Sequence, residues 1–117
     1  EVGEGRGRRE ASERVLVELL DNAVRHARSA MSVTVDVDGE QLRVRVLDDG
    51  PGLPGGGVDP FAPPQEIGSR VGFGLWLVER LAAALQGSVG VERTGDEGTV
   101  MCLRLPLVAR LDSEQPG

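Results

Sequence analysis

The sequence predicts a single α+β domain in which helices cover one face of a mostly antiparallel sheet. Its 117 residues are enough for one small hydrophobic core. Apolar residues recur at helical spacing in two segments and alternate with polar residues in four short ones. These segments follow one another in the order helix, strand, strand, helix, strand, strand. Short alternating strands also fit a small β-barrel, but the two intact helices and the lack of further strand segments argue against it.

The first third of the chain predicts a linker, a helix and a hairpin. Residues 1–11 combine Gly, Arg and Glu without periodicity, which is typical of a linker. Ser12 can cap a helix of about four turns. The apolar positions of this helix are Val15, Leu16, Leu19, Leu20, Ala23, Val24 and Ala27. Residues 33–37 and 42–47 then alternate on either side of Asp38-Gly39, which predicts an antiparallel hairpin with one buried face.

The middle of the chain changes in composition. Residues 50–74 contain eight glycines and five prolines among 25 residues, so we expect a functional lid at about 53–71. Apolar residues then recur at helical spacing from Leu75, and Gly87 is expected to terminate this second helix.

Two further strands, at 88–93 and 99–105, are predicted beyond the second helix. The residues after them become polar, as is typical of a loose terminus. We therefore place the domain at 12–108 and a flexible tail at 109–117.

Composition and charge narrow the range of functions. The net charge of −6 argues against binding nucleic acid through phosphate neutralisation. No apolar run approaches the roughly 18 residues of a membrane-spanning helix, and no basic start leads into an apolar block. We therefore expect a cytoplasmic domain, whose parent protein can still be membrane-anchored. The single cysteine, Cys102, excludes an internal disulfide framework and a multi-cysteine metal site.

One side of the first predicted helix is polar. At about 100° per residue, this side carries Glu18, Asn22, Arg25 and His26, and the aliphatic stripe faces elsewhere. Such a side is usually no more than a solvated face. Asn22 is the chain's one asparagine, however, and asparagine disfavours helix interiors. Because an amide oxygen suits Mg²⁺, Asn22 is a candidate metal ligand. A lone histidine such as His26 is more often structural than catalytic.

Glycine-containing segments flank the predicted lid. Asp48 ends the second strand segment, and Gly50 and Gly52 after it allow a ligand to approach the backbone closely. A carboxylate here can accept a hydrogen bond from an exocyclic amine such as that of adenine, although Asp-Gly is also a common turn. The run Gly72-Phe73-Gly74-Leu75 leads directly into the second helix. The N-terminus of that helix can bind an anion, although the glycines can also form a hinge.

Together these motifs resemble the Bergerat ATP-binding fold of histidine kinases, Hsp90, DNA gyrase and MutL. The matching segments are, in order, 18–27 (the N box), 48–53 (the G1 box), Pro60-Phe61 (the F box of histidine kinases), 72–78 (the G2 box), and Gly98-Thr99 with the strand that ends at Leu105-Pro106. The resemblance covers about 12–106. It implies an α/β sandwich with a mixed, mostly antiparallel sheet covered on one face by helices.

The resemblance also implies a site for ATP and Mg²⁺. Asn22 would coordinate the metal ion that bridges the phosphates, and Asp48 would accept the adenine amino group. Gly50 and Gly52 would shape the adenine pocket, with Leu53 against the base. The other implied nucleotide-binding residues are Arg25, His26, Gly72, Phe73, Gly74 and Leu75 near the phosphates and Thr99 at the adenine end.

Two positions depart from the family's pattern. Arg70 stands where kinases usually carry the first glycine of the G2 box, and it could meet a phosphate or stiffen the lid. Glu18 stands where histidine kinases usually carry asparagine. In the ATPase branch of the family, a glutamate at this position activates water as a general base, so ATP hydrolysis by Glu18 stays open.

The implied function is that of the ATP-binding catalytic domain of a two-component sensor histidine kinase. The one histidine, His26, lies inside a nucleotide motif, so the acceptor histidine would lie on a separate phosphoacceptor and dimerisation segment. The domain would not be competent alone, a response regulator would act downstream, and we expect the isolated domain to be a monomer. The alternatives are an anti-sigma-factor-type serine kinase, an ATPase or ATP-driven clamp that uses Glu18, and a degenerate ATP-binding module.

Overall fold

Two helices and four strands form within residues 2–55, 59–63 and 73–107, the parts of the chain that the computed structural model describes. The elements are α1 (Val2–His26), β1 (Met31–Asp38), β2 (Gln41–Asp48), α2 (Phe73–Ala84), β3 (Ser88–Gly95) and β4 (Gly98–Pro106). Their order confirms the predicted α+β fold. The described strands form one sheet with two edges, so the barrel alternative is wrong for this part of the chain.

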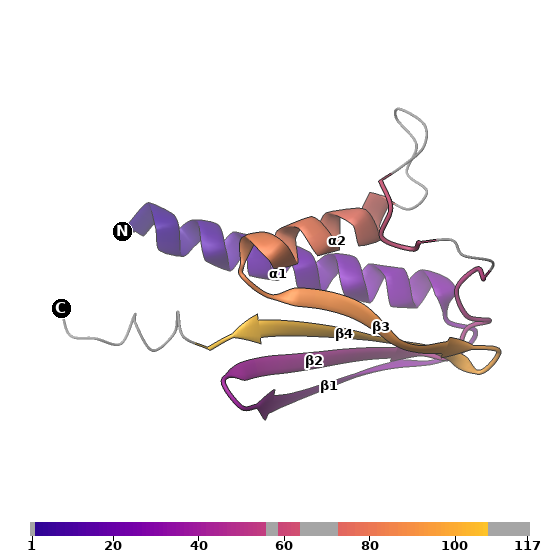
Figure 1. Ribbon diagram of the computed structural model, residues 1–117. Helices are drawn as coiled ribbons and strands as arrows, with labels where there is room; N and C mark the ends of the chain where they lie inside the picture. Colours follow the sequence, from indigo (N-terminus) through magenta and orange to yellow (C-terminus); the bar gives the residue numbers. More distant parts are fainter. Residues whose placement is uncertain (1, 56–58, 64–72, 108–117) are drawn as a thin grey trace.

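The elements lie in two layers, with α1 and α2 side by side over one face of the sheet (Figure 1). The strand order is β1-β2-β4-β3, and every neighbouring pair among these strands is antiparallel. The expected antiparallel character is confirmed. The parallel pair that a mixed sheet would contain does not occur among the described strands.

The hydrophobic core lies between the helices and the two central strands. Side chains alternate along a strand, and this alternation turns Val44 and Val46 of β2 and Met101 and Leu103 of β4 toward the helices. Each of these four side chains is at most 4% exposed. The helices contribute buried residues at helical spacing, namely Val15, Leu19 and Ala23 from α1 and Leu75, Val78 and Ala82 from α2.

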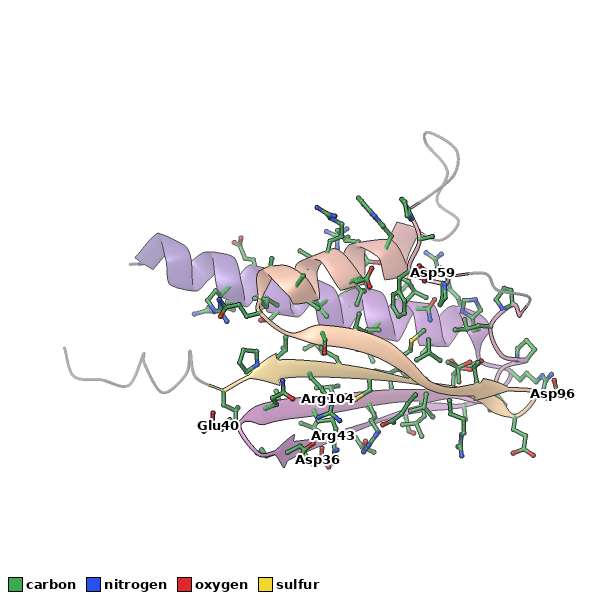
Figure 2. The ribbon with its side chains drawn as sticks, in the orientation of Figure 1. Asp36, Glu40, Arg43, Asp59, Asp96 and Arg104 are labelled. Carbon is green, nitrogen blue, oxygen red and sulfur yellow. The ribbon has the colours of Figure 1, made fainter. Side chains whose placement is uncertain are left out.

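The opposite face of the sheet carries paired charges. Arg43 on β2 donates two hydrogen bonds, of 2.9 and 2.7 Å, to Asp36 on β1. Arg45 likewise donates a bidentate pair of hydrogen bonds to the Glu92 carboxylate on β3, at 2.6 and 3.0 Å. Figure 2 shows Asp36, Arg43 and Arg104 on the side of the sheet away from the helices. These hydrogen bonds lower the pKa of the Asp36 and Glu92 carboxyls, but exposed ion pairs of this kind add little stability.

The edge strand β1 presents an uncovered row of valines. The register pairs Val33 with Val46 and Val35 with Val44, so these valines face the same side of the sheet as the core. Val33, Val35 and Val37 are nevertheless 43%, 59% and 60% exposed. The helices pack over β2, β3 and β4 and leave the outer edge uncovered.

The first helix begins ten residues before the predicted position. The segment predicted as a linker over residues 1–11 is helical from Val2, and the cap predicted at Ser12 is wrong, because α1 starts ten residues earlier. Ser12 lies inside the helix, and its hydroxyl donates to the Arg8 carbonyl one turn earlier at 2.9 Å. A serine can occupy a helix interior when it satisfies its hydroxyl in this way. The weak apolar periodicity of the first turns hides them from a pattern search.

The second helix ends in a Schellman motif whose left-handed residue is Gln86. Gln86 has φ +65°, its N–H donates to Ala83 O at 2.9 Å, and the N–H of Gly87 donates to Ala82 O at 2.8 Å. Gly87 is therefore one position beyond the residue that needs the unusual backbone. A side chain at Gly87 would collide with the Arg104 carbonyl of β4, so the glycine allows α2 to turn closely into the sheet.

A carboxylate clamp joins the end of α1 to the end of β2. Asp49 Oδ1 accepts backbone hydrogen bonds from Arg28, Ser29 and Ala30 at 2.8, 3.0 and 3.2 Å. Asp49 Oδ2 accepts the Ser29 hydroxyl at 2.6 Å. Hydrogen bonds from the Ser29 hydroxyl and from these backbone groups hold the pKa of the Asp49 carboxyl far below its ordinary value. The clamp orients the residues that follow β2 relative to α1.

We expect Asp49→Asn to lower the melting temperature at neutral pH by a few degrees. A carboxyl whose folded-state pKa is depressed contributes stability above its unfolded value of 3.8, and this contribution is lost as the pH falls toward the folded value. The difference between wild type and variant should therefore shrink below about pH 4. This difference in melting temperature is measured by thermal unfolding, monitored by circular dichroism, at several pH values between 7 and 3. Asp96→Asn, in the turn between β3 and β4, is the matched control, and a pH-independent difference would contradict the clamp.

Candidate functional site

Four segments that carry the predicted site residues meet at one end of the two layers. They are the C-terminal half of α1, the end of β2 with the residues that follow it, the start of β4 after the β3–β4 turn, and the start of α2 (Figure 1). The Arg28 guanidinium at the end of α1 donates to the Asp96 carbonyl in the β3–β4 turn at 3.2 Å, which joins α1 to the turn that leads into β4. This meeting of distant segments defines the candidate site.

Asp48 is the half-buried last residue of β2, and its side chain alternates onto the helix-facing side. Its Oδ1 accepts the N–H of Gly50 at 2.8 Å, which fixes the orientation of the carboxylate. In the register between β2 and β4, Asp48 lies opposite Thr99, which is 4% exposed. The structure thus brings together two residues that were predicted from motifs 51 positions apart.

Three glycines allow the backbones of these segments to touch. A side chain at Gly50 would collide with the His26 carbonyl of α1, and one at Gly98 with the Asp48 carbonyl. Gly52 has φ +92°, and a Cβ there would lie 2.5 Å from the Gly95 carbonyl oxygen. Gly50 and Gly52 were predicted from the G1 box, and the structure supplies the steric reason for both.

Leu53 and Thr99 are joined by a residue that the sequence analysis missed. The backbone N–H of Leu53 donates to Thr94 Oγ1 at 2.8 Å, and Thr94 Oγ1 lies 2.8 Å from Thr99 Oγ1. Leu53 itself is half-buried against the core. Thr94 belongs to no motif, and only its pairing with Thr99 across the β3–β4 hairpin could have identified it.

The polar side of α1 divides into an inner and an outer part. Glu18 and Asn22, one turn apart, are half-buried. Arg14 Nε donates to Glu18 Oε2 at 2.8 Å. A Cβ added to Gly74 would lie 3.2 Å from Glu18 Oε1, so the glycine allows this carboxylate to reach the first turn of α2. Glu18 therefore lies at the positive end of the α2 dipole.

Arg25 and His26 lie on the outer part of this side and are exposed. Arg25 forms an ion pair with Asp21 at 3.0 Å, one turn earlier on α1. His26 Nδ1 lies 2.9 Å from the carbonyl oxygen of Asn22. Both side chains contact their own helix, so the structure does not bring either of them to Asp48 or to the start of α2.

The start of α2 is only partly described. Phe73 is its first residue, and the Leu75 side chain is 6% exposed and belongs to the core. Leu75 can therefore meet an anion at this helix terminus only through its backbone N–H, because its side chain is buried in the core. The predictions for Arg70 and Gly72 fall outside the described residues.

Phe61 anchors the middle of the segment predicted as a lid. Its side chain is 9% exposed and packs in the hydrophobic core. The turn before it is held by Asp59, whose carboxylate accepts the Phe61 N–H at 3.0 Å and whose carbonyl accepts the Ala62 N–H at 3.1 Å. The Gly- and Pro-rich composition indicated a loop but did not reveal this anchor.

The residues at this end suit an adenine nucleotide and a hard cation. Asp48 supplies a charged acceptor, and Asn22 and Glu18 supply an amide oxygen and a carboxylate. Within the described residues, no group of three or more His, Cys, Asp or Glu side chains could hold a metal ion alone. None of the described helices is long and apolar enough to cross a membrane.

Comparison with known proteins identifies the family. The model of the histidine kinase-, DNA gyrase B- and HSP90-like ATPases matches residues 7–109. The sensor protein KdpD of Rathayibacter rathayi is 32% identical over 115 residues, and the sensor protein TorS of Escherichia coli K12 is 35% identical over 98 residues. These matches cover 90% and 80% of this chain but only 14% and 11% of the relatives. The chain thus spans a small part of these sensor proteins.

Solved structures agree with this result. The histidine kinase AdeS of Acinetobacter baumannii superimposes with a TM-score of 0.69 at 23% identity, over 85% of this chain and 47% of that one, and supports the fold. Full-length ShkA in complex with AMPPNP gives a TM-score of 0.66 at 29% identity, over 82% of this chain and 21% of that one. The chain belongs to the histidine kinase-, DNA gyrase B- and HSP90-like ATPase family, as an ATP-binding catalytic domain of the sensor histidine kinase type.

Proposed function

We propose that this chain binds MgATP at the end of the fold where Asp48 faces Thr99, and donates the γ-phosphoryl group to a histidine on another segment or protein. The pairing of Asp48 with Thr99 beside three close-packed glycines is the observation that carries the proposal. The complex of ShkA with AMPPNP supports it, because that relative has the same fold and binds an ATP analogue.

The adenine base would be recognised at the end of β2. The Asp48 carboxylate, oriented by the Gly50 N–H, would accept the exocyclic amino group of the base. The half-buried Leu53 would contact the ring, and the Thr99 hydroxyl would support the same edge. The three glycines would keep side chains away from the space that the base enters.

The phosphates would lie between the start of α2 and the polar side of α1. Backbone N–H groups and the dipole of α2 favour an anion at Gly74 and Leu75. The Glu18 carboxylate lies at the same helix terminus, and the chain carries a net charge of −6, so phosphates there would need a cation. Magnesium, held in part by Asn22, would supply this charge compensation during phosphoryl transfer.

The acceptor histidine would come from outside this chain's own nucleotide site. The one histidine, His26, lies at the end of α1 with its ring against its own helix. A phosphoacceptor and dimerisation segment would therefore present its histidine to the γ-phosphate, and a response regulator would receive the group afterwards. Catalysis by the chain would consist of positioning the reactants and stabilising charge. We expect the phosphoryl transfer to take place in the cytoplasm.

ATP hydrolysis is a second candidate function, favoured by one observation. Glu18 is a half-buried carboxylate at the N-terminus of α2, where the γ-phosphate would lie. A carboxylate at this place can act as a general base toward water. An anti-sigma-factor-type serine kinase would use the same nucleotide site with a different acceptor.

We expect Asp48→Asn to weaken ADP binding at least about tenfold, because hydrogen bonds to charged groups contribute about 1.5–3 kcal/mol. Isothermal titration calorimetry measures the change against a wild-type affinity in the micromolar range. Asp36→Asn, on the opposite face of the sheet, is the matched control. Equal affinities of wild type and Asp48→Asn would refute the role of Asp48, and absence of MgATP and MgADP binding by wild type would refute the proposed function.

We expect Asn22→Ala to remove most of the dependence of nucleotide affinity on magnesium. With the amide oxygen lost, ADP affinity in the presence of Mg²⁺ should fall about tenfold toward the value in EDTA. Titrations with and without Mg²⁺ give the two affinities for wild type and variant, and the EDTA values serve as the internal control. An unchanged magnesium dependence would show that Asn22 is not the ligand.

We expect the chain to phosphorylate histidine in trans. Mixing it with radiolabelled ATP and phosphoacceptor fragments of sensor kinases should yield an acid-labile, base-stable phosphoprotein, since phosphohistidine has this stability. Acid-stable phosphoserine would point to the serine kinase. Steady phosphate release by the domain alone, lost in Glu18→Ala, would instead support the ATPase.

A further inference from the structure

A chain of three polar groups connects the predicted lid to the buried threonine of the site. The Leu53 N–H donates to Thr94 Oγ1 at 2.8 Å, and Thr94 Oγ1 lies 2.8 Å from Thr99 Oγ1. The three residues come from the segment after β2, from β3 and from β4. Leu53 and Thr94 are 41 positions apart, so this contact exists only in the folded chain.

The chemistry of the donors constrains both hydroxyl groups. A backbone N–H can only donate, so Thr94 Oγ1 must accept from Leu53. One hydroxyl hydrogen then lies between Thr94 and Thr99, donated by one to the other. Because Thr99 is 4% exposed, water cannot easily replace this partner. Thr94 therefore determines how the Thr99 hydroxyl is oriented.

The backbone around these groups has little room to shift. Gly52, with φ +92°, packs against the Gly95 carbonyl so closely that a Cβ would lie 2.5 Å from its oxygen. This contact blocks movement of the segment after β2 toward the β3–β4 turn. The hydrogen bond from Leu53 to Thr94 opposes movement in the other direction. Together they hold Leu53 at one distance from the strand that carries Thr99.

We propose that Thr94 is a positioning residue for the base-binding end of the nucleotide site. It sets the backbone of Leu53 and the hydroxyl of Thr99 in one arrangement, so that both meet the same adenine ring opposite Asp48. This inference rests on the proposed function, since it assumes that an adenine nucleotide binds here. Thr94 acts through Leu53 and Thr99 and requires no contact of its own with the ligand.

The test compares Thr94→Val, which keeps the shape and removes the hydroxyl, with Thr94→Ser, which keeps the hydroxyl. We expect Thr94→Val to weaken MgADP binding about fivefold, in line with the loss of one hydrogen bond, and Thr94→Ser to stay within about twofold of wild type. Isothermal titration calorimetry on the 117-residue chain gives the affinities. Thr34→Val, an exposed threonine on β1, is the matched control.

A double-mutant cycle separates positioning from general destabilisation. The effects of Thr94→Val and Thr99→Val should be strongly non-additive, because both act through one hydrogen bond, whereas Thr94→Val and Asn22→Ala should add. Thermal unfolding of each variant confirms that it is folded. If Thr94→Val does not fold, amide hydrogen exchange of Leu53 in the wild type takes the place of the Thr94→Val titration. We expect the Leu53 amide to be protected from exchange in the protein without nucleotide.

Four results would overturn the inference while wild type still binds MgADP. They are an unchanged affinity in Thr94→Val, an equal loss in Thr94→Ser, additive effects of Thr94→Val and Thr99→Val, and an unprotected Leu53 amide. If wild type does not bind MgADP at all, the proposed function fails, and the role of Thr94 fails with it. The wild-type titration distinguishes these two cases.

Discussion

At the end of the molecule where α1, β2 and the β3–β4 turn meet, main chains touch with no side chain between them. Gly50 lies against the His26 carbonyl, Gly98 against the Asp48 carbonyl, and Gly52 against the Gly95 carbonyl. The first of these contacts sets the spacing between the helix layer and the sheet, and the other two set the spacing between the segment around the end of β2 and the β3–β4 hairpin. A single added methyl group at any of them would force apart segments that carry different parts of the site.

The hydrophobic core that stabilises the fold and the polar residues of the candidate site lie in different parts of the two-layer structure. The core between the two layers is mostly aliphatic. Half-buried polar side chains of the site lie outside it, with Asp48 at the end of β2 and Glu18 beside the start of α2. There Glu18 already supplies a negative charge to the helix terminus, so an anionic ligand and the protein compete for the same partial positive charge. A cation between them would resolve this conflict and would let an acidic domain accommodate the polyphosphate of the proposed ligand.

Sequence reasoning could predict the order of elements because burial imposes a period on apolar residues, as in Val44, Val46, Met101 and Leu103. Family motifs could also assign Asp48 and Thr99 to the adenine end of one site, and the strand register then shows that the two residues lie opposite each other. Sequence reasoning misplaced the start of α1, since the sequence of the first turns has little apolar periodicity. It assigned the helix-terminating conformation to Gly87, because a positive φ at Gln86 leaves no signal in the residue type.

Contacts between residues distant in the chain were beyond sequence reasoning for a different reason. Thr94, Phe61 and Asp49 act through partners that the fold supplies, and a hydroxyl, a ring or a carboxylate in a loop looks alike whether or not such a partner exists. Motifs identify residues that meet a ligand. Phe61 and Asp49 lie inside the F and G1 boxes, but the motifs do not reveal which contacts these two residues make. Thr94 belongs to no motif, and its role becomes recognisable only once the backbone geometry is known.

The valines of β1 have a consequence for how the chain behaves at high concentration. An edge strand with exposed apolar side chains is a template on which another strand can add, since its outward N–H and C=O groups have no neighbour within the described sheet. The carboxylates of Asp36 and Asp38 act as gatekeepers, because stacking two such strands would bring like charges together. Hydrogen bonds from Arg43 and Arg104 hold the pKa of these two carboxyls below its ordinary value, so their charges on the edge strand persist into moderate acid.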